Sequence, residues 1–88
     1  MMDEIQAEMP KYQCHKTVHA LKISRIETTD DSPTALLYFE DHSFAPKTVD
    51  ESFVRRHKPE VGGYYVVYDD GYASWSPAKA FEDGYSRI

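Results

Sequence analysis

The feature that most constrains the fold of this chain is the dipeptide Asp70-Gly71, which lies between two short runs of strand-forming residues. An Asp-Gly pair in this setting predicts a β-hairpin, because a two-residue type I′ turn needs positive φ angles that Gly adopts freely and Asp tolerates. A loop of two residues also fixes the register of the hairpin, and it pairs Tyr68 with Ala73 and Val66 with Trp75.

Side chains alternate between the two faces of a strand, so this register predicts the composition of each hairpin face. The face that carries Trp75 is expected to be the core face, and it also holds Tyr64, Val66, Tyr68 and Ala73. The second face holds Tyr65, Val67, Tyr72 and Ser74. Because this second face is rich in aromatic and apolar groups, we expect it to be either partly covered or available to a partner.

The rest of the chain predicts a small antiparallel sheet. Lys11 to Ile26 is expected to be extended, with Leu21 and Ile23 on one face and Val18 and Ala20 on the other, although a helix is a competing interpretation. The composition further predicts a loop at Thr28–Pro33, a strand at Thr34–Glu40 and a short edge strand at Phe44–Val49.

Two short helices are indicated by their start signals. Asp50 is a favourable N-cap for a helix from Glu51 to about His57. Ser76 is expected to cap a second helix with Pro77 at its first position, and Tyr85 is expected to fold back on the end of that helix. The predicted fold class is therefore α+β: an antiparallel sheet of about four strands with a C-terminal β-hairpin and two short helices, one or both of them over one face.

The 88 residues are enough for one domain, and we expect residues 1–10 to be a flexible lead-in and residues 11–88 to be the folded part. No apolar stretch approaches the ~20 residues of a membrane span, and no signal peptide is evident. The formal net charge of −5 argues against general nucleic-acid binding, which needs clustered Lys and Arg. These features predict an intracellular protein that does not enter a membrane.

No motif for catalysis or metal binding is found. Cys14, His15 and His19 match no zinc signature, and two ligands four residues apart on a strand are separated by ~13 Å. We expect both histidines to be half-exposed on the sheet. Neither Ser74 nor Ser76 lies in a nucleophile elbow. The sequence therefore predicts a protein that is not an enzyme, with no catalytic residues, no metal and no cofactor.

The polar feature that most suggests binding is the basic run Arg55-Arg56-His57-Lys58. An acidic protein with one basic cluster near several tyrosines could hold a phosphate-bearing ligand, with Arg as a bidentate donor and a ring stacked on a base. A solvated helix face is the alternative. The predicted binding residues are Arg55, Arg56, Lys58, Tyr65 and Tyr72.

The segment from Lys58 to Tyr85 resembles a group of small uncharacterised proteins of tailed bacteriophages and prophages. The ending KPxVGxYYVVYxDGYxSxSPxxAFExGY is common in that group, and the stretch from Pro10 to Ile23 resembles the start of the same proteins. The segment Pro59 to Tyr64 is also loosely similar to the turn of the PGDYG family. The resemblance implies a viral accessory protein in the host bacterial cytoplasm, and it supplies no active-site residues.

Three functions follow as hypotheses. The first is a non-enzymatic accessory protein that inhibits or sequesters a host factor in counter-defence, with a host protein or a nucleotide-type small molecule as its partner. The second is a structural or assembly protein of the virion. The third is a small enzyme. The aromatic second face of the hairpin would also suit a homodimer.

Overall fold

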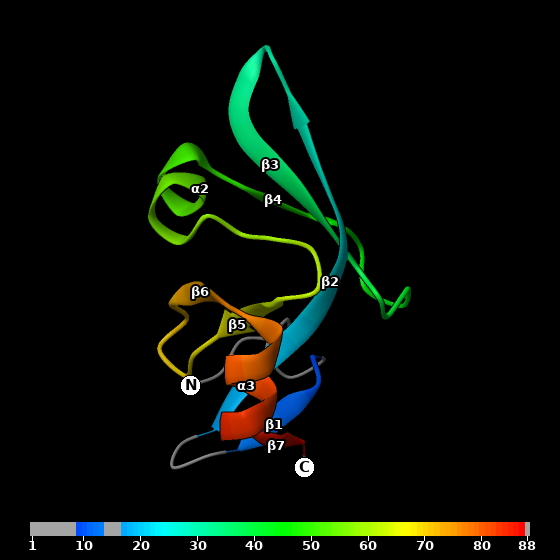
Figure 1. The fold of residues 1–88 in the computed structure, drawn as a ribbon, viewed down its shortest axis with the longest axis vertical. Helices are drawn as coiled ribbons and strands as arrows, with labels where there is room; N and C mark the ends of the chain where they lie inside the picture. The colour runs from blue at the N-terminus through cyan, green and yellow to red at the C-terminus, as the bar shows by residue number, and fades with distance from the viewer. Residues whose placement is uncertain (1–8, 14–16, 88) are drawn as a thin grey trace.

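The computed structural model describes residues 9–13 and 17–87, which form seven strands and two short helices (Figure 1). Their order is β1 (Lys11–Gln13), β2 (Thr17–Thr29), β3 (Ser32–Phe39), β4 (Lys47–Val49), α2 (Glu51–His57), β5 (Tyr64–Val67), β6 (Ala73–Ser76), α3 (Ala78–Gly84) and β7 (Ser86–Arg87). All strand pairs are antiparallel. The α+β prediction is confirmed, with more strands than the four or so expected.

The 13-residue strand β2 is the axis of the fold, and it runs through most of the length of the molecule (Figure 1). One edge of β2 pairs with β1 and then, further along the strand, with β3. Two backbone hydrogen bonds place both neighbours on this edge: Ala20 N donates to Pro10 O, and Glu40 N donates to Lys22 O. The other edge pairs with β5, from His19↔Val67 to Lys22↔Tyr64. A single strand therefore joins the two halves of the sheet.

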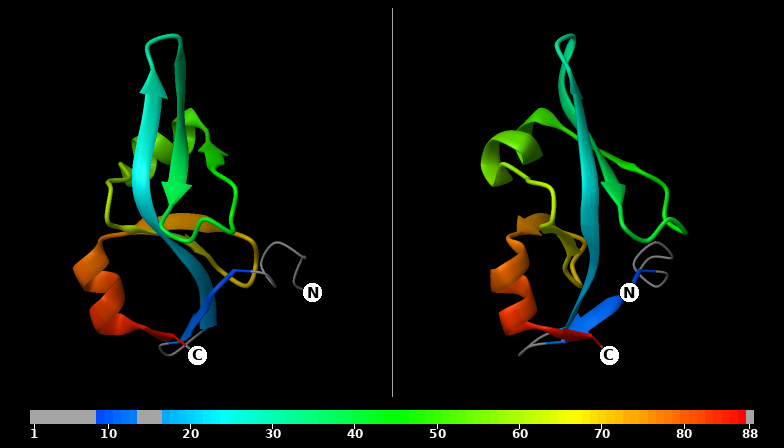
Figure 2. Two further views of the ribbon diagram at one scale, coloured as in Figure 1. Left: turned by 90° about the vertical axis from the view of Figure 1, so that its right-hand side faces the viewer. Right: turned by 45° about the vertical axis from the view of Figure 1, so that its right-hand side comes forward.

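The second half of β2 and the first half of β3 form an arm that extends beyond the rest of the chain (Figure 2). The pair Thr29↔Ser32 closes this arm around the turn Asp30-Asp31. The predicted loop at Thr28–Pro33 is therefore wrong. The threonines of this segment are β-branched and therefore suit a strand as well as a loop. The hydroxyls of Ser32 and Thr34 lie 2.8 Å apart and hydrogen-bond to each other.

Two hydrophobic cores lie on opposite sides of β2 and β5. The first core contains Met9, Leu21, Ile23, Ala35, Leu37, Phe39, Val49, Tyr65 and Val67. The second core contains Val18, Ala20, Tyr64, Val66 and Phe81. The predicted division of β2, with Leu21 and Ile23 facing away from Val18 and Ala20, is confirmed.

Each helix covers a different core. Phe53 and Val54 of α2 pack against the first core. Phe81 of α3 is 1% exposed in the second core, where its ring stacks on Tyr64 at 4.3 Å and on Tyr85 at 4.6 Å. The expectation of one or two helices over a single face is wrong, because both faces of β2 and β5 are apolar and each is covered by a helix.

The register of the β5–β6 hairpin differs from the predicted one by one residue. Tyr68 N donates to Tyr72 O, Gly71 N donates to Tyr68 O, and Gly71 has a φ of +88°. The loop is thus the three residues 69–71, in the arrangement of a type I turn followed by a glycine bulge. Trp75 consequently pairs with Tyr65 and packs on the first core, instead of sharing a face with Tyr64 and Val66.

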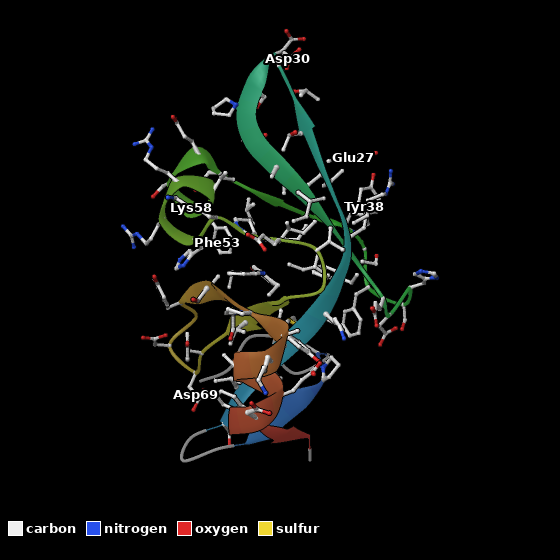
Figure 3. All side chains as sticks on the ribbon, viewed as in Figure 1. Glu27, Asp30, Tyr38, Phe53, Lys58 and Asp69 are labelled. Carbon is white, nitrogen blue, oxygen red and sulfur yellow. The ribbon has the colours of Figure 1, made fainter. Side chains whose placement is uncertain are left out.

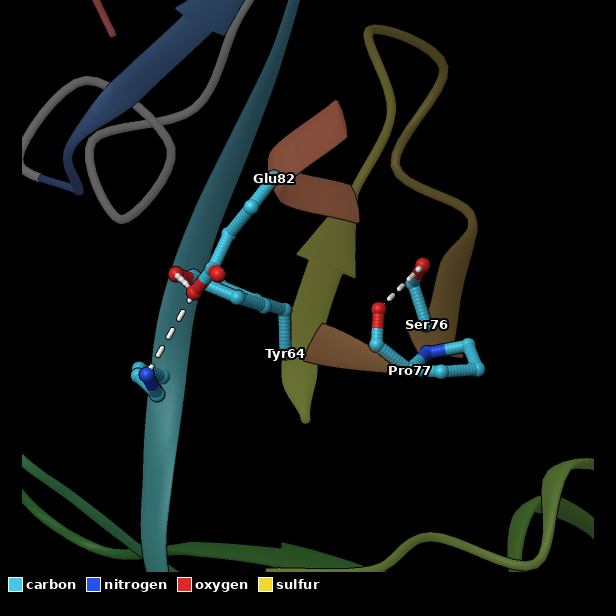
Figure 4. Close-up of polar contacts among 5 residues, drawn as sticks. Tyr64, Ser76, Pro77 and Glu82 are labelled. Atoms are coloured by element: carbon cyan, nitrogen blue, oxygen red, sulfur yellow. Dashed lines mark hydrogen bonds and ion pairs between the residues drawn. The ribbon is translucent and has the colours of Figure 1, made fainter. Parts of the chain in front are cut away.

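Of the two predicted helix N-caps, one is confirmed and the other is wrong. Asp50 Oδ1 accepts from Phe53 N at 2.9 Å, so the predicted cap of α2 is confirmed. α3 begins at Ala78 after an uncapped Pro77, and the Ser76 hydroxyl donates to Pro77 O at 3.4 Å (Figure 4). The predicted Ser76 cap is wrong, because Ser76 is still paired in the sheet opposite Tyr64. Tyr85 does fold back, since its N donates to Phe81 O.

Candidate functional site

The structure places the five sequence-predicted binding residues in different environments. Arg55, Arg56 and Lys58 are exposed at the end of α2, and Tyr72, which directly follows the β5–β6 loop, is 46% exposed. Tyr65 is only 8% exposed, and its burial raises the pKa of its hydroxyl. The expectation that Tyr65 faces a partner is wrong, because both faces of β5 are covered and Tyr65 packs in the first core.

A small pocket brings together two of these residues, Arg56 and Tyr72. It lies between α2 and the β5–β6 hairpin, has a volume of about 160 Å³, and is lined by Asp50, Ser52, Phe53, Arg56, His57, Tyr72 and Ala73. We call it the α2 pocket. The Tyr72 hydroxyl lies 3.3 Å from His57 Nε2, and the two rings meet edge to face at 6.2 Å. This contact links α2 to the hairpin.

The base of the α2 pocket is fixed by packing against the first core. The Phe53 ring lies 4.7 Å from the His57 ring and 6.0 Å from the Tyr65 ring. Tyr65 in turn contacts Phe39 at 6.0 Å. Figure 3 shows Phe53 on the side of α2 that faces the sheet, whereas Lys58 follows the last residue of the helix. Tyr65 thus supports the pocket from below.

The cations near the α2 pocket differ in whether they have a partner. Arg55 is ion-paired with Glu51 on the same helix. The side chains of Arg56 and Lys58 make no hydrogen bond or ion pair with any residue that the structure describes. Burial, followed by the nearby charge of Arg56, lowers the pKa of His57 below 6.5, so its ring is neutral at pH 7. The α2 pocket therefore offers one guanidinium and neutral hydrogen-bonding groups.

The sequence identifies Asp50 as a helix cap and His57 as a member of the basic run, and it does not place either of them in a pocket with Tyr72. Their place in the α2 pocket depends on the contact between α2 and residue 72, which are far apart in the sequence. The sequence signals that pointed to this site were the basic run and the nearby tyrosines, and they predicted Arg56 and Tyr72 as binding residues.

Other polar groups lie elsewhere. His19 is 1% exposed, so the expectation of a half-exposed residue is wrong, whereas the predictions for Cys14 and His15 fall outside the described residues. On the described part of the chain no three His, Cys, Asp or Glu side chains are grouped as metal ligands, and no helix is long and apolar enough to cross a membrane.

The outer face of the arm carries a further polar cluster. Arg25 donates to Glu27 at 2.6 Å, Tyr38 OH donates to Glu27 at 2.9 Å, and the Arg25 guanidinium lies 3.9 Å from the centre of the Tyr38 ring. The hydrogen bond to Glu27 raises the pKa of Tyr38. Figure 3 shows Glu27 and Tyr38 on the side of β2 away from α2. The charged and hydrogen-bonding groups of this cluster are therefore paired with one another.

Comparison with known proteins gives one informative result. No protein-family model and no curated protein matches the sequence. Among solved structures, the fold is similar to the NMR solution structure of the monomeric form of the phage L decoration protein, with a TM-score of 0.70 and 28% sequence identity. The match covers 94% of this chain and 62% of that chain, so the chain spans less than two thirds of the length of its structural relative.

This similarity supports the coarser part of the resemblance found in the sequence, that of a bacteriophage protein. It contradicts the leading functional prediction. The similar protein is a decoration protein and therefore a structural component of a virion, not an inhibitor of a host factor and not an enzyme. The prediction of a counter-defence protein was wrong because it relied on the absence of catalytic motifs, which a virion protein shares.

Proposed function

We propose that this chain is a virion structural protein that decorates the outside of an assembled phage capsid. The observation that carries the proposal is the similarity to the phage L decoration protein over 94% of this chain. At 28% identity the two chains share sequence as well as fold, and the shared region includes both hydrophobic cores of this domain.

The composition and surface suit such a role. A protein that binds an assembled particle needs a rigid fold and an accessible surface, and it needs no catalytic group. Two separate cores around β2 supply the rigidity. Exposed Arg and Tyr side chains, which are enriched in protein interfaces, lie together at the α2 pocket. The chain would be made in the host bacterial cytoplasm, where the particles assemble.

Binding to capsids tests the proposal directly. The phage that encodes this chain is grown with the gene deleted, and its purified DNA-filled heads are mixed with increasing amounts of the purified protein. We expect the protein to sediment with the heads in a saturable amount, and to add density at fixed positions of the capsid surface in electron cryomicroscopy. Protein without heads, and protein with heads of an unrelated phage, should stay in the supernatant.

The same material can also contradict the proposed function. If virions of the unmodified phage contain no copy of this chain by mass spectrometry, and deleted heads bind none of the added protein, the chain is not a decoration protein.

A further inference from the structure

We propose that the α2 pocket is the docking site for the capsid, and that it receives a carboxylate side chain from the surface of the capsid protein. This inference rests on the proposed function, and it adds the surface and the chemistry of the contact. It concerns Arg56, Lys58 and Tyr72, with His57 as the group that positions Tyr72.

The first argument is the state of the arginines. Three arginine side chains are described, and two of them already have carboxylate partners: Arg25 pairs with Glu27, and Arg55 pairs with Glu51. Arg56 has no such partner among the described residues, although the chain carries an excess of acidic groups. A guanidinium presents a planar set of donors that matches a carboxylate in two parallel hydrogen bonds. An external carboxylate is therefore the natural complement of Arg56.

The second argument is the ring beside it. Tyr72 is the most exposed of the large aromatic side chains that the structure describes, at 46%, and it lines the same pocket as Arg56. Tyr and Arg are the residue types that most often dominate the energy of protein interfaces. Their meeting at one pocket favours a protein partner, because the Tyr72 ring can cover the segment that carries the carboxylate.

The third argument is the supply of donors. His57 is neutral at pH 7, so one nitrogen of its ring donates and the other accepts. In the contact between Tyr72 OH and His57 Nε2, either the hydroxyl donates or the ring donates. If the ring donates, the hydroxyl proton is left for a ligand, and if the hydroxyl donates, the N–H of the other ring nitrogen remains. Each arrangement leaves one N–H or O–H of the Tyr72–His57 pair that their own contact does not use.

The acidic residue of the α2 pocket does not fill this role. Asp50 directs its Oδ1 to the N–H of Phe53, at the first turn of α2, and so its charge is held at the helix start. Lys58 follows directly after α2 and has no described partner, so it adds a second positive charge at the far end of the helix. The ends of α2 thus differ in charge, and the end with Arg56 and Lys58 attracts an anion.

Capsid binding of single variants tests the inference. Heads that lack the protein are titrated with unmodified protein and with Arg56→Ala, Arg56→Lys and Tyr72→Phe, at low and at physiological salt. We expect Arg56→Ala to weaken binding about tenfold or more. Arg56→Lys should restore part of the affinity, because it keeps the charge and loses the planar fork, and Tyr72→Phe should weaken binding several-fold. Added salt should weaken the unmodified protein more than it weakens Arg56→Ala.

The charge-matched control is Lys79→Ala. Lys79 lies on α3 and its partner is Asp83 on the same helix, so this variant loses one positive charge away from the α2 pocket and should bind normally. Circular dichroism and thermal unfolding check that each variant is folded, which is expected because Arg56 is exposed.

The outcomes separate the two proposals. If the unmodified protein does not bind heads, the proposed function fails. If it binds and folded Arg56→Ala binds equally well with the same salt dependence, the function stands and the docking site is wrong. Binding that disappears after nuclease treatment of the heads would make nucleic acid the partner and would also overturn the carboxylate contact.

Discussion

The indole ring of Trp75 lies directly against Gly63: a Cβ atom built on Gly63 would be 2.3 Å from Trp75 Nε1 and 2.5 Å from Cε2. No side chain fits at this distance unless the ring moves, and the ring is rigid and packed on the first core. We expect Gly63→Ala to lower the free energy of unfolding by about 1–3 kcal/mol, the usual range for overpacking. Urea denaturation measures this difference.

Gly84 provides the comparison for that variant. A Cβ on Gly84 has no atom within 4 Å, and its φ is not positive. As the last residue of α3, it should accept Ala with no loss, and with a gain of up to about 1 kcal/mol from helix propensity. Equal destabilisation by the two substitutions would show that loss of glycine itself, and not the Trp75 contact, is responsible.

The two predicted helix caps, Asp50 and Ser76, should differ in how much their removal lowers the stability of the protein. Removing the Asp50 carboxylate leaves the N–H of Phe53 without its acceptor, so Asp50→Ala should cost about 0.5–2 kcal/mol. Ser76→Ala removes only a long bond to Pro77 O and should change stability by less than about 0.5 kcal/mol. Thermal unfolding of both variants checks this order, and a larger cost for Ser76→Ala would contradict the structure at the start of α3.

A pH-dependent contribution comes from Glu82. Its Oε2 accepts from Tyr64 OH at 2.7 Å and from Lys22 Nζ at 3.3 Å (Figure 4). These bonds, that from Tyr64 first, lower the pKa of Glu82 from its ordinary 4.5. Because the folded state has the lower pKa, the stabilisation is complete above pH 4.5 and is lost as the pH falls through the lowered value.

Tyr64→Phe isolates this effect, since it removes the hydroxyl and keeps the ring that stacks on Phe81. We expect NMR titration of the Glu82 carboxyl to show a pKa closer to the ordinary value, and the unfolding free energy to fall less on acidification than in the unmodified protein. Tyr38→Phe removes a hydroxyl bonded to a different residue, Glu27, and should leave the Glu82 pKa unchanged. An unchanged Glu82 pKa in Tyr64→Phe would exclude the proposed cause.

Much of the local structure was predictable because single residues carry strong signals. Asp50 identified the start of α2, the alternation of Val18, Ala20, Leu21 and Ile23 identified both faces of β2, and Asp70-Gly71 identified a hairpin. The length of the hairpin loop was not predictable. An Asp-Gly pair fits the two positions of a type I′ turn and also the last two positions of a three-residue loop, and only Gly71 needs its positive φ in both.

The hydrophobic pattern could not resolve this ambiguity. All four residues of β5 are buried, so either face of the strand can be a core face, and a shift of one residue leaves the pattern equally good. The burial of both faces also explains Tyr65, which was expected to bind a partner and is instead part of the first core. Of the predicted binding residues, Arg56 and Tyr72 meet in one pocket, and that proximity depends on tertiary contacts that the sequence does not display.

β2 contributes alternate side chains to both cores, and this has a consequence for folding. Detaching the strand would remove Leu21 and Ile23 from one core and Val18 and Ala20 from the other, so neither core can open while the other stays intact. Its pairing with β3 is local, whereas His19 meets Val67 only after a long loop has closed, so we expect this closure to be the later and slower step of folding. The domain should melt as a single cooperative unit.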